Sequence, residues 1–167
     1  MSKTRGPAKT NAARRLDELG LPYELLAFQA PPDDLSAETA ARLLGLPEAM
    51  VYKTLVLAGP RGGHVEACLP AGRDLDLKAL ARAAGERSLE LAPVARLFEL
   101  VGYKRGGCSP LGGRRQFPVF VHDEALGLAQ MAVNAGARGL MLLLTPQALI
   151  AAAEARTAPI AGPPKRA

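Results

Sequence analysis

The sequence predicts a mixed α/β protein of the α+β type, with a largely antiparallel sheet and flanking helices. Three observations lead to this fold class. Apolar segments of strand character alternate with segments of helical periodicity. Two neighbouring extended segments, 51–57 and 64–69, are separated by a short turn with glycines, as in a hairpin. Three further extended segments follow one another without a crossover helix, which favours a mixed sheet.

The first half of the chain is expected to hold two helices and three strands. Apolar residues at 12, 13, 16 and 19 share one helical face, and Gly20 is typical of the position after a helix end. Ser36 can cap a second helix, which runs to Leu44 and stops at Gly45. The extended segments are 23–28, 51–57 and 64–69, with loops at 29–35 and 58–63.

The second half is expected to hold three helices and four strands. Asp74 or Asp76 caps a helix that ends at Gly85, and Pro93 opens the next one at its first turn. Thr145 and Pro146 open the last helix. The expected strands are 88–91, 117–122, 128–134 and 140–144. The apolar positions expected to face inward are Leu77, Leu80, Ala81 and Ala84, then Val94, Leu97, Phe98 and Val101, and finally Leu149, Ile150 and Ala153.

The 167 residues predict one domain, at 10–156, between a basic flexible N-terminal tail at 1–9 and a flexible C-terminal tail at 157–167. The net charge of +5 comes from the tails, because the body balances 16 basic against 16 acidic residues. A balanced body argues against a general DNA coat and so against DNA as a partner, although the tails could attract polyanions. The tail cations are Lys3, Arg5, Lys9, Lys165 and Arg166.

Composition also limits the partners and the compartment. The longest apolar run, Leu140–Leu144, is far shorter than the ~20 residues of a membrane span, so no membrane partner is expected. The two cysteines form no CxxC or Cys/His metal spacing, and neither a metal nor a cofactor is predicted. We therefore expect a cytoplasmic protein with reduced thiols.

The segment from Gly102 to Arg115, GYKRGGCSPLGGRR, is the most site-like part of the chain. It holds five glycines and four basic residues, and no acidic residue lies between Glu99 and Asp123. Glycines allow a close backbone approach, and backbone N–H groups beside Lys104 and the arginines suit an anionic ligand. The segment matches neither phosphate-loop template, so a mobile connection is the alternative interpretation. The hydroxyl of Ser109 is expected to make a turn hydrogen bond.

Lys53 interrupts the apolar strand VYKTLVL on the face of Val51, Leu55 and Leu57. Its ammonium either meets an anionic ligand in a cleft or reaches water from an edge strand. A second glycine turn, 133–140, either connects two strands or brings Asn134 and Arg138 to the same cleft.

No nucleophile is evident in the sequence. His64 and His122 form no visible dyad with a cysteine. Cys68 is expected on the exposed phase of its strand, and Cys108 is either a thiol of lowered pKa or a bystander.

The segments VYKTLVL, GYKRGGCSPLGGRR and VNAGARGLMLLLTPQAL, in this order, resemble the YbaK/EbsC family over roughly residues 10–155. The members are free-standing relatives of the editing domain in bacterial prolyl-tRNA synthetases. The resemblance implies a trans-editing hydrolase without a metal. Its partner would be the acceptor end of mischarged tRNA, often Cys-tRNA(Pro), and prolyl-tRNA synthetase is a further partner to test.

The resemblance also implies roles for particular residues. Lys53 would contact the terminal aminoacyl-adenosine, with Thr54 beside it, and the backbone of Gly106 and Gly107 would face the ester. Orientation and N–H donors could then catalyse hydrolysis by the substrate's own thiol or by water. The remaining substrate-binding positions would be Phe28, Lys104, Cys108, Ser109, Asn134, Gly136, Arg138 and Gly139.

Three residues depart from the cysteine-removing relatives. Asn134 replaces a serine, Phe28 replaces a tyrosine found in some members, and Met141 occupies a position that is polar in others. The amino acid removed therefore stays open, with alanine, serine or a non-protein amino acid as alternatives to cysteine. A non-catalytic module for tRNA ends or a synthetase, and a hydrolase or binder of a free nucleotide or small anion, remain the other hypotheses.

Overall fold

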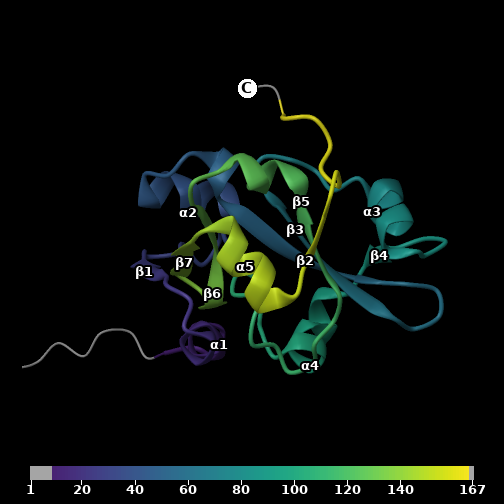
Figure 1. The fold of residues 1–167 in the computed structure, drawn as a ribbon, viewed down its shortest axis with the longest axis horizontal. Helices are drawn as coiled ribbons and strands as arrows, with labels where there is room; N and C mark the ends of the chain where they lie inside the picture. The colour runs from purple at the N-terminus through teal and green to yellow at the C-terminus, as the bar shows by residue number, and fades with distance from the viewer. Residues whose placement is uncertain (1–8, 166–167) are drawn as a thin grey trace, which may run out of the picture.

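The computed structural model describes residues 9–165, which form two β-sheets with helices packed around them (Figure 1). Residues 1–8, which carry most of the predicted N-terminal tail, lie outside the described residues. The elements are α1 (Asn11–Leu19), β1 (Glu24–Ala27), α2 (Ala37–Leu44), η1 (Glu48–Met50), β2 (Tyr52–Ala58), β3 (His64–Pro70), α3 (Leu77–Ala84), β4 (Glu90–Leu91), η2 (Val94–Arg96), α4 (Leu97–Val101), β5 (Val119–His122), η3 (Asp123–Gly127), β6 (Met131–Ala137), β7 (Leu140–Leu144), α5 (Pro146–Ala153) and β8 (Arg156–Ala158).

The mixed, largely antiparallel arrangement is confirmed, but the strands divide between two sheets. The larger sheet has the order β4-β2-β3-β5-β8, in which β3 pairs parallel with β5, and β5 parallel with β8. The smaller sheet, β1-β7-β6, is antiparallel throughout. An isolated parallel bridge between Val51 and Ala132 connects the sheets at the start of β2, next to Lys53.

Side-chain caps fix the helix boundaries as the sequence predicts. Ser36 accepts a hydrogen bond from the backbone N–H of Thr39, and Thr145 does the same for Ala148. Of the two candidate caps of α3, Asp76 is the one used. Gly20, Gly45 and Gly85 take the left-handed conformation that ends a helix.

The core lies on both faces of the larger sheet. One cluster includes Tyr52, Cys68 and Val121 and extends to α1, α5 and the smaller sheet. A second cluster packs α3 against the other face through Leu80, Val65 and Phe120. Strand β3 is therefore buried on both faces, so the expectation of an exposed Cys68 was wrong.

Three apolar side chains expected to face inward are exposed instead. Leu77 is 41% exposed, Val94 58% and Phe98 52%. The helix after Pro93 is split into the 3₁₀ turn η2 and the short helix α4, so one helical period does not run through it. Phe98 is covered in part by the Arg114 guanidinium, 5.1 Å from the ring centre.

The segment 157–165 was expected to be a flexible tail, and this expectation was wrong. Strand β8 pairs with β5, and the Ile160 side chain is 0% exposed in the cluster beneath α3. The backbone N–H groups of Ile160 and Ala161 both donate to Nδ1 of the buried His122, at 3.2 Å each. A filled apolar site and satisfied backbone groups hold this segment on the domain.

Ile160→Ala should lower the free energy of unfolding by about 2–5 kcal/mol, because it empties a fully buried site. Urea denaturation measures this change. The exposed Pro164→Ala is the control and should change stability by less than about 0.5 kcal/mol. Equal stability of the two variants would contradict the docking of the segment.

Strand β3 also carries a buried acid, Glu66, whose side chain is 4% exposed. Burial raises the pKa of Glu66 to about 8. It lines a small hollow of about 260 Å³ with Arg15 and Arg115. The folded protein therefore holds Glu66 largely protonated at neutral pH.

Glu66→Gln should stabilise the protein increasingly as the pH rises from 4.5 to about 8. In this range the unfolded chain has an ionised Glu66 and the folded chain a protonated one, so the burial cost grows by about 1.4 kcal/mol per pH unit. Urea denaturation at several pH values measures the difference between variant and wild type. The exposed Glu90→Gln is the control. A pH-independent difference would show that Glu66 is ionised in the folded state.

Candidate active site

A pocket of about 710 Å³ opens where β2, α2, the segment from β4 to α4 and residues 102–115 meet. We call residues 102–115 the glycine loop. Its walls combine residues that are far apart in the sequence. From the residues predicted as functional, the pocket is lined by Phe28, Lys53, Thr54, Gly106, Cys108 and Asn134. The structure thus brings the three segments of the sequence resemblance to one cavity.

Lys53 reaches the pocket from the middle of β2 and is half-buried. Its strand pairs with β3 at this point, opposite Leu69, whereas β4 pairs only with Leu57 and Ala58. Among residues 9–165, the edge of β2 beside Lys53 is therefore free of a strand partner, and it borders the cavity. Both interpretations of the lysine thus apply in part, since it lies at an open edge and lines a cleft.

Glu38, in the first turn of α2, is an acid in the same pocket. Burial by itself would raise the pKa of Glu38, but hydrogen bonds from its own N–H and that of Gly72, with the charges of Lys53 and Lys165, lower it below its usual value. The Gly72 N–H lies 2.6 Å from Oε1. Glu38 is therefore a carboxylate in the field of two lysines. The sequence predicts the helix that begins after Ser36, but no local signal in it placed Glu38 in a site.

Of the two adjacent glycines in the glycine loop, Gly106 lines the pocket and Gly107 does not. Gly106 has φ +81°, and a Cβ there would lie 2.9 Å from the Leu35 side chain. Gly107 does not line the pocket; its N–H donates to Lys104 O at 2.8 Å, and a Cβ there would lie 3.2 Å from the backbone of Ala137. The resemblance implies that the backbone of Gly107 faces the ester, but its N–H is engaged in a turn in this structure.

The N–H groups of Gly106 and Cys108 remain as donors at the pocket wall. Within residues 9–165 neither has a protein acceptor among the hydrogen bonds. A strong backbone donor without a partner at a cavity wall is suited to a ligand oxygen.

Asn134 fixes the position of this loop. Its Nδ2 donates to Gly106 O at 2.9 Å, while its Oδ1 accepts from the N–H groups of Gly136 at 2.7 Å and Ala137 at 3.1 Å. These bonds coincide with the register shift between β6 and β7. The Asn134 amide thus supplies the hydrogen-bond acceptor for two backbone N–H groups of the irregular strand β6 and connects this strand to the glycine loop.

The other predicted substrate-binding residues support the pocket from outside. Arg138 Nε donates to Arg105 O at 3.0 Å, and buried Ser109 Oγ accepts from Leu111 N–H at 3.3 Å, which is the expected turn bond. Gly136 lies against the Tyr103 ring, and Gly139 against Phe28 O, both with positive φ. Lys104 is exposed and does not line the cavity.

The protein's thiols and imidazoles are not arranged as nucleophiles. Burial raises the pKa of Cys108 to about 12, so the alternative of a lowered thiol pKa was wrong. Burial also raises the pKa of Cys68, whose Sγ lies 3.6 Å from Thr54 Oγ1. His64 lines a different pocket, and His122 is engaged with the C-terminal segment.

Some wall residues, namely Leu91, Val94, Leu97 and Lys165, carried no signal of a pocket role in the sequence, whereas Arg105 and Met141 did. Leu91, Val94 and Leu97 form an apolar wall, which explains why Val94 is exposed. Arg105 and Lys165 bring positive charge to the same cavity, and Met141 lies across it. Among residues 9–165 there is no group of three His, Cys, Asp or Glu that could hold a metal, and no helix there is long and apolar enough to cross a membrane.

The chain belongs to the aminoacyl-tRNA editing domain family, whose model matches residues 32–152. A candidate Cys-tRNA(Pro)/Cys-tRNA(Cys) deacylase from Enterococcus faecalis, EbsC, is 39% identical over 150 residues, which cover 90% of this chain and 92% of that protein. The protein is thus an aminoacyl-tRNA editing enzyme, a hydrolase of the deacylase class.

Solved structures support the same assignment. The crystal structure of a candidate trans-editing enzyme for prolyl-tRNA synthetase has a TM-score of 0.77 at 25% identity, over 93% of this chain and 100% of that one. A hypothetical protein, APE2540, has a TM-score of 0.83 at 25% identity, over 92% of this chain and 100% of that one.

Asn134→Asp should lower the rate of ester hydrolysis about tenfold to a hundredfold, because it removes the donor to Gly106 O but keeps the acceptor for Gly136 and Ala137. Asn134→Ala removes all three bonds and should also cost about 1–3 kcal/mol of stability. Single-turnover kinetics and thermal unfolding separate the two effects. Wild-type rates in Asn134→Asp would show that this tether does not position the loop.

Proposed function

We propose that the chain is a trans-editing enzyme that removes cysteine from mischarged tRNA(Pro) without using a protein nucleophile. The observation that carries this proposal is the pocket itself. It joins a lysine and two unengaged backbone N–H groups, while the thiol of Cys108 stays protonated. Such a site can orient an ester and stabilise an oxyanion.

The aminoacyl ester requires little additional activation. We assign the N–H groups of Gly106 and Cys108 to the developing oxyanion, and the ammonium of Lys53 to the terminal adenosine. The thiol sulfur of a bound cysteine attacks its own ester carbon. The ribose 3′-oxygen leaves as a hydroxyl with the proton that the thiol loses, and water then opens the resulting cyclic thioester to release free cysteine. Gly107 contributes by allowing the loop to approach residues 137–138, and not by donating.

The proposed macromolecular partner is the acceptor end of tRNA(Pro). The relative named as a Cys-tRNA(Pro)/Cys-tRNA(Cys) deacylase supports this choice. Arg105 and Lys165 add positive charge where a terminal phosphate would enter. A complex with prolyl-tRNA synthetase is consistent with the solved trans-editing relative.

Removal of alanine is the second candidate function, because nothing in the pocket wall requires the bound amino acid to carry a thiol. Asn134 makes three hydrogen bonds within the protein, so its amide is occupied in supporting the loop. Asn134, one of the three residues that depart from the cysteine-removing relatives, is therefore not free to select the amino acid. Phe28 and Met141 are left as the selective surfaces on that side of the pocket.

The proposal predicts rapid loss of cysteine from Cys-tRNA(Pro), slower loss of alanine from Ala-tRNA(Pro), and a fall of about 10²–10³-fold for cysteine in Lys53→Ala. Hydrolysis of both charged tRNAs, with and without prolyl-tRNA synthetase, measures these rates. Lys78→Ala, an exposed lysine of α3, is the control and should match wild type.

Other results of these assays would favour one of the alternative functions. Preferred loss of alanine would keep the enzyme class and change the substrate. Full activity in a folded Lys53→Ala protein would reject the role of the lysine. Tight tRNA binding without hydrolysis of either species would support a binding module instead.

A further inference from the structure

A second hollow, of about 1180 Å³, lies at the other end of the β2–β3 hairpin and is lined by none of the proposed catalytic residues. Its walls come from the hairpin turn, the start of β5, α4 and the segment around β8. Three arginines line it, Arg96, Arg115 and Arg156, against two acids, Glu86 and Glu154. The family resemblance assigns no role to this hollow.

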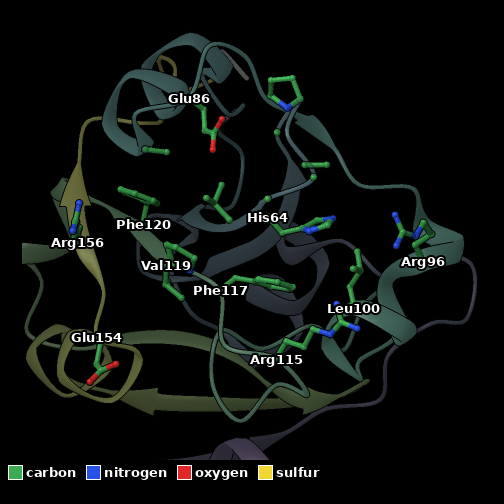
Figure 2. A pocket seen from close by; sticks show the side chains of 18 residues that line it. His64, Glu86, Arg96, Leu100, Arg115, Phe117, Val119, Phe120, Glu154 and Arg156 are labelled. Atoms are coloured by element: carbon green, nitrogen blue, oxygen red, sulfur yellow. The ribbon is translucent and has the colours of Figure 1, made fainter.

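The charges in the hollow are separated. Figure 2 shows Arg96, Arg115, His64 and Phe117 together on one side, whereas Glu86 and Glu154 lie on other walls. In the described part of the chain Arg115 has no ion pair, and Arg96 has only a 3.6 Å contact with Glu99 on the half-exposed surface. Burial lowers the pKa of His64, and the charges of Arg96 and Arg115 lower it further, so both guanidinium groups act on the ring.

An aromatic pair lies at the same side. The rings of His64 and Phe117 have centroids 5.2 Å apart and are tilted by 38°. Guanidinium groups match phosphate, and aromatic faces match unstacked bases. Arginine beside an aromatic pair is thus the combination that single-stranded nucleic acid requires.

The two pockets share their dividing wall. Val94 and Leu97 line the candidate active site, whereas Arg96 and Leu100, on the same η2–α4 segment, line the second hollow. The glycine loop is divided similarly, with Arg105 at the first pocket and Arg115 at the second. An RNA strand whose end enters the first pocket can therefore reach the second by crossing one short helical segment.

We propose that the second hollow binds a nucleotide of the tRNA acceptor end, with its phosphate at Arg96 and Arg115 and its base against Phe117 and His64. This inference rests on the proposed function, since it places another part of the same substrate. It also helps a body of balanced charge to recognise RNA, because Arg96 and Arg115 add positive charge beyond that of the first pocket.

The test measures the affinity of a fluorescein-labelled, uncharged acceptor-stem minihelix ending in CCA by anisotropy at several salt concentrations. Arg96→Ala/Arg115→Ala should bind at least about tenfold more weakly, with a salt slope shallower by about one per arginine lost. Arg14→Ala/Arg82→Ala removes two exposed charges from α1 and α3 and should bind within about twofold of wild type. Phe117→Leu keeps apolar bulk and should weaken binding about tenfold through lost stacking.

Wild-type affinity and salt slope in Arg96→Ala/Arg115→Ala would overturn the proposal, as would equal losses in the control pair. Competition by free AMP as strong as by the minihelix would overturn it in favour of a free-nucleotide site. Because the probe is uncharged RNA, binding is read separately from hydrolysis. A hollow that binds RNA in a protein that hydrolyses no charged tRNA would refute the proposed function alone.

Discussion

The geometry of the candidate active site depends on the side-chain amide of Asn134. Two of its hydrogen bonds satisfy backbone groups exposed by the register shift in the smaller sheet, and the third holds Gly106 O of the glycine loop. The bridge between Val51 and Ala132 connects the same strand, β6, to the strand of Lys53. Lysine and loop are thereby positioned from one strand, and their spacing does not depend on a long flexible connection. The site is thus more rigid than its glycine content suggests.

The charges around the pocket depend on where these strands and the C-terminal segment place their side chains. Lys53 lies at a free strand edge, where an ammonium can remain hydrated, and the carboxylate of Glu38 lies within its field. Lys165 joins them because Ile160 fixes the C-terminal segment to the core. A residue near the end of the chain thus contributes to a pocket built mainly from residues 28–141. The anchoring of the C-terminal segment by Ile160 therefore also determines part of the charge in the site.

The sequence predicted most of what depends on local interactions. Caps such as Ser36, end glycines such as Gly45 and the hairpin around residues 58–63 follow from neighbouring residues alone, and the structure confirms them. The sequence could not predict that β3 is covered on both faces. Alternation of apolar and polar residues shows which side chains share a face of a strand, but not what packs on that face. Cys68 was therefore wrongly expected to be exposed. Ile160 is a single apolar residue in a proline-rich stretch without periodicity, so its buried position depends on a site formed by α3 and β5. The resemblance located six pocket residues, whereas Glu38 and the apolar wall of Leu91 and Val94 arise only when distant segments meet.

The mechanism that we propose uses no protein nucleophile, and this determines how such an enzyme can be selective. A catalytic thiol or hydroxyl in the protein would attack any ester that the pocket admits, so discrimination would depend on fit alone. One missing methylene changes binding by only about 1–3 kcal/mol. In the site described, the burial of Cys108 and the turn bond of Ser109 remove these groups from the reaction. In the proposed mechanism, attack by the substrate's own thiol adds a chemical requirement that proline and alanine cannot meet, so both are left with the slower attack by water. On this proposal the pocket can be roomy and still spare correctly charged tRNA, because the mischarged cysteine itself supplies the reacting group.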